Sequence, residues 1–132
     1  MLQRNRTVGR APQPTRDPAE LERELAAALL TPASADEMTR LLRDLCTPAE
    51  IRSIAERWHV ARLLDGSDLS YRDIHDATGV STTTIVRVAR FLRQEPHQGY
   101  RAALERLRSG QSPLARQTRP PEDTATEPNN VR

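Results

Sequence analysis

The chain has 132 residues, a length that allows one small domain with terminal extensions. Hydrophobic residues make up 36% of it and aromatic residues 3%, so any core is small and mostly aliphatic. No run approaches the roughly 20 apolar residues of a membrane helix, no signal-peptide pattern is present, and the single cysteine, Cys46, excludes an intramolecular disulfide. We therefore expect a cytoplasmic protein. A formal charge of +2 is too small to indicate nucleic-acid binding by itself.

The two ends of the chain have few residues that could be buried. Residues 1–16 contain four arginines and no acidic residue, and residues 109–132 contain four prolines. We expect a disordered basic arm over 1–16 and a disordered proline-rich tail over 109–132, with a helical domain over 17–108 between them. The arm either has no role or adds phosphate contacts beside a DNA-binding domain.

Helix signals follow one another through the central segment. Asp17-Pro18 with Glu20 predicts a helix to about residue 30, and Ser34 with Glu37 forms a capping box for a helix to about residue 45. Thr47-Pro48 with Glu50 repeats the signature and starts the longest helix, to about residue 64. A last helix is expected over about 96–108. No segment alternates as a strand would, so the fold class is all-α.

Apolar stripes give these helices their expected buried faces. The longest helix carries one stripe and a second shorter one, composed of Ile51, Ile54, Ala55, Trp58 and Ala61, and of Val60, Leu63 and Leu64. The last helix offers Tyr100, Ala103, Leu104 and Leu107.

Residues 69–93 predict a helix-turn-helix motif. Each of its two helices follows a capping serine, Ser70 (with Asp73 as capping-box partner) and Ser81. Gly79 supplies a residue that can adopt positive φ in the tight turn between them. The second helix has three arginines and no acidic residue, a composition that favours DNA as the partner: Arg87, Arg90 and Arg93.

The second helix of the motif divides into two faces when its residues are placed at about 100° intervals. One face is an aliphatic stripe of Ile85, Val88, Ala89 and Leu92, and the other carries Thr83, Val86, Arg87, Arg90 and Arg93. Arginine can bind guanine or phosphate, threonine can bind bases or backbone, and methyl groups can pack on thymine. The alternative is an ordinary solvated face.

The remaining helices keep apolar stripes that so short a motif cannot cover. Self-association would cover them, and a two-fold dimer would present two recognition helices about 34 Å apart, one turn of DNA. We expect a homodimer, with a monomeric bundle as the alternative.

Four motifs occur together at a spacing that is specific to one family: LCTPAE at 45–50, IAER at 54–57, SYRDI at 70–74 and TGVSTTTIVRV at 78–88. Over about residues 34–108 the chain resembles the Trp-repressor superfamily and, within it, the YerC/YecD branch. The resemblance implies an all-helical, intertwined homodimer that binds double-stranded operator DNA through its helix-turn-helix and regulates transcription. We therefore expect a repressor that is associated with the nucleoid.

The resemblance also implies DNA-contacting positions. In the first helix of the motif they are Tyr71, Arg72 and His75, and in the second Ser81, Thr82, Thr83 and Val86. The outward face of the second helix adds Arg87 and Arg90. Thr82 and Thr83 are the candidates for base or water-mediated contacts, and Arg72 and Arg90 for phosphate or guanine. For His75 the alternative is a solvated side chain.

Six positions match the tryptophan pocket of the family: Thr47, Arg57, Thr84, Arg87, Val88 and Phe91. Two of them depart from it, because Val88 replaces a glycine that leaves room for the indole and Phe91 replaces a serine that helps to hold the amino group. We expect these larger side chains to fill the cavity, so that neither tryptophan nor any cofactor is required. Arg57 and Arg87 would then be structural, for example in ion pairs.

No enzyme signature is present. The three histidines, His59, His75 and His97, do not share a helix face at ligand spacing, and Cys46 has no neighbour that would activate it and is expected in the core. No phosphate-binding loop or nucleophile–base motif occurs. Two alternatives to an effector-independent repressor stay open: a helix-turn-helix module that binds another protein of a transcription complex, and a repressor that responds to a different small effector.

Overall fold

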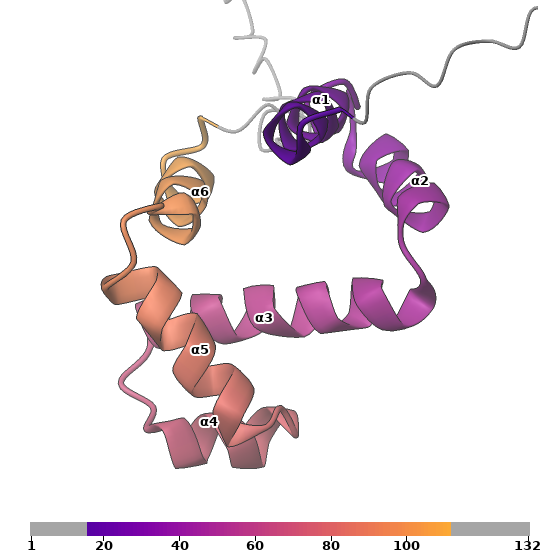
Figure 1. Cartoon of the computed structure of the whole chain (residues 1–132). Helices are drawn as coiled ribbons and strands as arrows, with labels where there is room; N and C mark the ends of the chain where they lie inside the picture. Colours follow the sequence, from indigo (N-terminus) through magenta and orange to yellow (C-terminus); the bar gives the residue numbers. More distant parts are fainter. Residues whose placement is uncertain (1–15, 112–132) are drawn as a thin grey trace, which may run out of the picture. The chain divides into compact units, whose positions relative to one another are not determined.

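The computed structural model describes residues 16–111, and within that range the chain forms six helices and no strand (Figure 1). The helices are α1 (Pro18–Leu29), α2 (Ala35–Leu45), α3 (Pro48–Gly66), α4 (Tyr71–Thr78), α5 (Thr82–Arg93) and α6 (Gly99–Arg108). The predicted all-α fold class is confirmed. The predicted arm and tail lie outside the described residues, apart from Arg16 and residues 109–111. In the described range no helix has the length and hydropathy to cross a membrane.

Helix α1 belongs to a compact unit that ends at Pro32, and α2 to α6 belong to a second unit that begins at Ala33. The predicted start of α1 is confirmed, because the Asp17 carboxylate accepts a hydrogen bond from the Ala19 backbone N–H at 3.3 Å and Pro18 occupies the first helical position. Arg16 forms an ion pair with Glu24. No residue of α1 is buried, and Leu21 and Leu25 are about half exposed.

Two further helix starts were predicted from capping signatures. At α3 the complete capping box is present, since the Thr47 hydroxyl accepts from the Glu50 N–H at 3.2 Å and the Glu50 carboxylate accepts from the Thr47 N–H at 2.8 Å. At α2 the Ser34 hydroxyl caps the Glu37 N–H, but the Glu37 carboxylate accepts from Ala33 N–H rather than from Ser34. The predicted reciprocal bond is therefore displaced by one residue, because the Glu37 side chain reaches past the cap.

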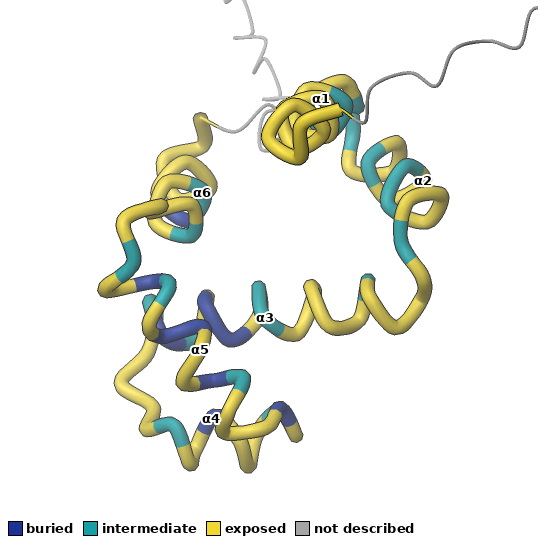
Figure 2. Tube along the Cα trace, in the orientation of Figure 1, coloured by how far each residue is buried: buried dark blue, intermediate teal, exposed yellow. Residues whose placement is uncertain are grey.

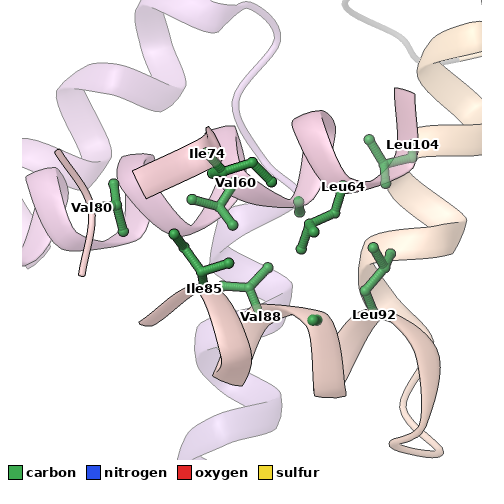
Figure 3. Close-up of a cluster of buried hydrophobic side chains, with 10 residues drawn as sticks. Val60, Leu64, Ile74, Val80, Ile85, Val88, Leu92 and Leu104 are labelled. Carbon is green, nitrogen blue, oxygen red and sulfur yellow. The ribbon is translucent and has the colours of Figure 1, made fainter. Parts of the chain in front are cut away.

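The core of the second unit lies where the C-terminal part of α3 meets α4, α5 and α6 (Figures 2 and 3). Its members are aliphatic, as the composition predicts: Val60, Ala61, Leu64, Ile74, Val80, Ile85, Val88, Ala89, Leu92 and Leu104. The four residues predicted as the buried stripe of α5 are all among them. Trp58 and Tyr100 are partly buried at its edge and stack with ring centroids 6.3 Å apart.

Outside this core the predicted apolar stripes are largely uncovered. Of the main stripe on α3 only Ala61 is buried, while Ile54 is 47% exposed. Helix α2 buries no residue, Leu107 of α6 is about half exposed, and Cys46 is half-buried rather than a core residue. The stripes were correctly located on the helices, but a single copy of α2 to α6 has no element that covers them.

The predicted start of the last helix was wrong. Helix α6 begins at Gly99 instead of near Pro96, after Gln98 in the left-handed conformation with φ 54°. The preceding turn is held by two side chains that bond backbone carbonyls: Gln98 Nε2 donates to Glu95 at 2.8 Å and Arg101 Nε donates to Leu92 at 3.0 Å. A proline disfavours helical backbone in the residue before it, which separates α5 from α6 at this point.

Candidate nucleic-acid interface

The turn between α4 and α5 is fixed by its own hydrogen bonds. Gly79 has φ 72°, the left-handed conformation that the sequence predicted for it, and its N–H donates to the His75 carbonyl at 2.8 Å. The Thr78 hydroxyl donates to the Ile74 carbonyl at 2.6 Å and accepts from the Val80 N–H at 3.1 Å. Since Val80 also buries its side chain in the core, the turn holds α5 at a set angle to α4.

Serine caps begin both helices of the motif. The Ser70 and Asp73 capping box is complete, with bonds of 3.1 Å and 3.0 Å. The Ser70 hydroxyl also donates to the Asp73 carboxylate at 2.7 Å. This bond and, to a smaller extent, the bond from the Ser70 N–H hold the pKa of the Asp73 carboxyl below its usual value. The Ser81 hydroxyl accepts from the Thr84 N–H at 3.2 Å and lies 3.0 Å from the Thr84 hydroxyl. The helix-turn-helix predicted over 69–93 is thus present with the predicted caps.

Helix α5 buries one face and exposes the other, as its sequence predicts. Ile85, Val88 and Leu92 point into the core with α3 (Figure 3). The residues of the outward face are all exposed, namely Thr82, Thr83, Val86, Arg87, Arg90 and Arg93. Val86 keeps 50% of its surface accessible. No acidic residue lies in the first turn, so the positive N-terminal end of the helix dipole is open to an anion such as phosphate.

The predicted contacts on α4 have different surroundings. Arg72 is exposed. His75 is not merely solvated, since its Nδ1 lies 2.7 Å from the Val80 carbonyl oxygen. A carbonyl oxygen can only accept, so Nδ1 donates this hydrogen bond. Tyr71 is half-buried, and its hydroxyl accepts from Arg93 Nη1 at 3.4 Å. The structure thus joins the start of α4 to the end of α5.

A family model described as Trp repressor protein matches residues 20–108, which is more than half of the chain and includes the whole helix-turn-helix. The chain belongs to the Trp repressor family. The uncharacterized protein YerC of Bacillus subtilis (strain 168) is 39% identical over 85 residues, or 64% of this chain and 80% of YerC. No solved structure matches the chain. The Trp repressor match also covers nearly all of α1, which the motifs that carried the resemblance left out.

Trp repressor proteins are a family of DNA-binding regulators rather than enzymes. The helix-turn-helix is therefore the candidate functional site of this chain. Among residues 16–111 no group of three histidine, cysteine, aspartate or glutamate side chains could hold a metal ion.

Two of the six positions that match the tryptophan pocket lie far apart along α3. Thr47 caps α3 while Arg57 lies ten residues further on the same helix, about 15 Å along its axis, and Arg57 Nε donates to the Ser53 carbonyl at 3.4 Å. Thr84 is tied to Ser81. The ion pairs formed within the described range involve other arginines, and neither Arg57 nor Arg87 is paired with an acidic residue there.

Val88 and Phe91 differ in their surroundings. Val88 is 1% exposed and belongs to the core. Phe91 is half-buried, with the Arg87 guanidinium carbon 4.4 Å and the Arg90 guanidinium carbon 5.3 Å from its ring centroid. Arg87 thus contacts an aromatic ring of its own helix in place of an acid.

Sequence reasoning missed the side chains that surround Arg87 and Arg90. Glu95 lies in the turn after α5 and approaches Arg90 Nε at 3.3 Å, and His97 stacks on Phe91 at 6.2 Å. The Arg87 and Phe91 contact has the i, i+4 spacing of neighbours on one helix face and could have been predicted. The contacts of Glu95 and His97 depend on the turn before α6, which carries no such regular spacing.

Proposed function

We propose that this protein is a homodimeric transcriptional repressor that binds specific double-stranded DNA with α5 in the major groove and does not need tryptophan. The observation that carries the proposal is the exposed face of α5. This face joins threonines, a valine and three arginines without an acidic residue, and four buried aliphatic side chains fix the opposite face. Such a face can bond base edges, pack on thymine methyl groups and neutralise phosphate.

Exposure and bonding suggest how the contacts divide. Thr82 and Thr83, at the exposed N-terminal end of α5, are proposed to contact bases directly or through water, with Val86 packing beside them. Arg72 and Arg90 are proposed to bind phosphate or guanine. The remaining proposed DNA contacts are Tyr71, His75, Ser81 and Arg87. Of these, Ser81 and His75 already hold the motif in shape through their other bonds.

Uncovered apolar surface supports the homodimer. In the second unit, α2 and the first half of α3 leave Leu45 and Ile54 about half exposed, and Leu107 of α6 is equally open. Burying apolar surface contributes about 25 cal/mol per Å², and a two-fold partner would supply a matching surface. A dimer also places two copies of α5 on one side, as palindromic DNA sites require.

Two side chains support independence from tryptophan. Val88 fills a place in the core, and the phenyl ring of Phe91 lies under two guanidinium groups. An indole would have to displace packed atoms at the first position and an arginine at the second, and overpacked sites are costly.

Selection of bound sequences from random duplex DNA tests the proposal, with and without L-tryptophan, at about 150 mM salt, where nonspecific binding is weak. We expect a palindromic motif with half-sites about one helical turn apart, recovered equally without the amino acid. A motif recovered only with tryptophan would overturn the independence from the corepressor. If no motif is recovered in either condition, the helix-turn-helix is a protein-interaction module instead.

A further inference from the structure

Phe91 lies at the boundary between the two faces of α5 and contacts Arg87 and Arg90, the two arginines of this helix proposed to bind DNA. The ring is half-buried, so its position is restricted by the protein on one side. The guanidinium carbons of Arg87 and Arg90 lie 4.4 Å and 5.3 Å from the ring centroid, within the range of attraction between a cation and an aromatic ring.

The turn that follows α5 completes this cluster. His97 is nearly parallel to Phe91, with an interplanar angle of 10° and centroids 6.2 Å apart. Glu95 approaches Arg90 through Nε at 3.3 Å, and both partners are partly exposed. The turn is itself held to the end of α5 by the bond from Arg101 Nε to the Leu92 carbonyl. Two helices and a bonded turn thus support one aromatic platform, defined here as Phe91 with His97.

We propose that Phe91 is a positioning residue, whose ring orients Arg87 and Arg90 for DNA before the complex forms; the proposal rests on the proposed function. Immobilising a long side chain on binding is unfavourable, and a side chain that is already oriented avoids most of that loss. A guanidinium that lies over a ring keeps its N–H donors directed sideways. Because Glu95 contacts Arg90 at Nε, the donors on the two terminal nitrogens are those available for guanine or phosphate.

The first test needs no DNA and uses the wild-type protein alone. Nuclear magnetic relaxation of the arginine Nε–H groups measures how restricted each side chain is on the picosecond to nanosecond timescale. We expect higher order parameters for Arg87 and Arg90 than for Arg72, which is exposed on α4. In F91L the value for Arg87 should fall to that of Arg72, whereas the value for Arg90 should fall less, because its Nε keeps the ion pair with Glu95. Equal mobility of the three arginines in the wild-type protein would overturn the positioning role, whatever the protein binds.

The second test is a double-mutant cycle on DNA affinity with F91L, R87A and the combined variant. We expect F91L to weaken specific binding about tenfold with an unchanged salt dependence, because every charge is kept. R87A should reduce the salt dependence of binding. The loss of DNA affinity caused by R87A should be about threefold smaller in the F91L background than in the wild type. F91Y, which keeps the ring, should bind like wild type, and thermal unfolding checks that F91L folds.

The outcomes of the second test separate the two proposals. Additive effects of F91L and R87A, or tighter binding by F91L, would overturn the positioning role while leaving DNA recognition intact. If the wild-type protein showed no preference for any duplex, the proposed function would fail, and the relaxation measurement would still decide whether the ring restricts Arg87 and Arg90.

Discussion

Replacing Gly79 by alanine should destabilise the protein through the backbone alone. Gly79 has φ 72°, and a Cβ atom built there meets no other atom within 4 Å, so no steric clash contributes. An L-residue in the left-handed conformation costs roughly 1–2 kcal/mol. For a domain of this size each kilocalorie lowers the melting temperature by about 4–8 °C, so we expect a decrease of about 4–16 °C for G79A.

Two other variants separate this effect from a general effect of substituting glycine. The melting temperature of G79N should fall less than that of G79A, since asparagine tolerates the left-handed conformation better than alanine does. G99A is the matched control, because a Cβ at Gly99 also meets nothing within 4 Å and no left-handed backbone is involved. At the start of α6 alanine should raise stability by up to about 1 kcal/mol. Thermal unfolding at one protein concentration, followed by circular dichroism, gives all three values. A G79A protein as stable as the wild type would show that the left-handed backbone at residue 79 imposes no such cost.

Two further predictions concern packing and titration. I85A truncates a side chain with 0% exposure and should lower the free energy of unfolding by about 2–5 kcal/mol. V86A, at the exposed neighbouring position, should change it by less than about 0.5 kcal/mol. Chemical denaturation measures both values, and similar losses would contradict the assigned faces of α5. Hydrogen bonds from the Ser70 hydroxyl and N–H lower the pKa of Asp73, so the stability that Asp73 contributes is present above about pH 4 and is lost as the pH falls through its lowered value. S70A should raise the pKa of Asp73, measured by carboxyl titration in magnetic resonance, and an unchanged pKa would show that the hydroxyl is not the cause.

Much of the helix-turn-helix could be predicted because local chemistry determines it. Ser70 with Asp73, Gly79 and Ser81 each act within three or four residues along the chain, and the structure shows each in its expected role. The two faces of α5 follow from helical periodicity, and the four aliphatic residues of the predicted stripe are all buried. Signals of this kind need no knowledge of the rest of the fold.

The features that were missed depend on contacts between elements or on irregular backbone. Ile54 carries the pattern of a buried residue, but burial requires a neighbour that α2 to α6 of one copy do not provide. The left-handed Gln98 and the turn before α6 have no capping signature, and the ion pair of Arg90 with Glu95 depends on that turn. Phe91 was expected only to fill a pocket, and its contacts with Arg87 and Arg90 were not predicted.

We propose that the outward face of α5 selects the DNA sequence. The most direct measurement compares the affinities of the wild type and of T83A/R90A for the selected duplex and for a scrambled duplex. The control is T39A/R40A, which changes the same residue types at exposed positions of α2. We expect the wild type and the control to prefer the selected duplex by about a thousandfold or more. T83A/R90A should lose that preference while keeping the helicity and the oligomeric state of the wild type. An unchanged preference in T83A/R90A would contradict the account and place sequence recognition elsewhere in the protein.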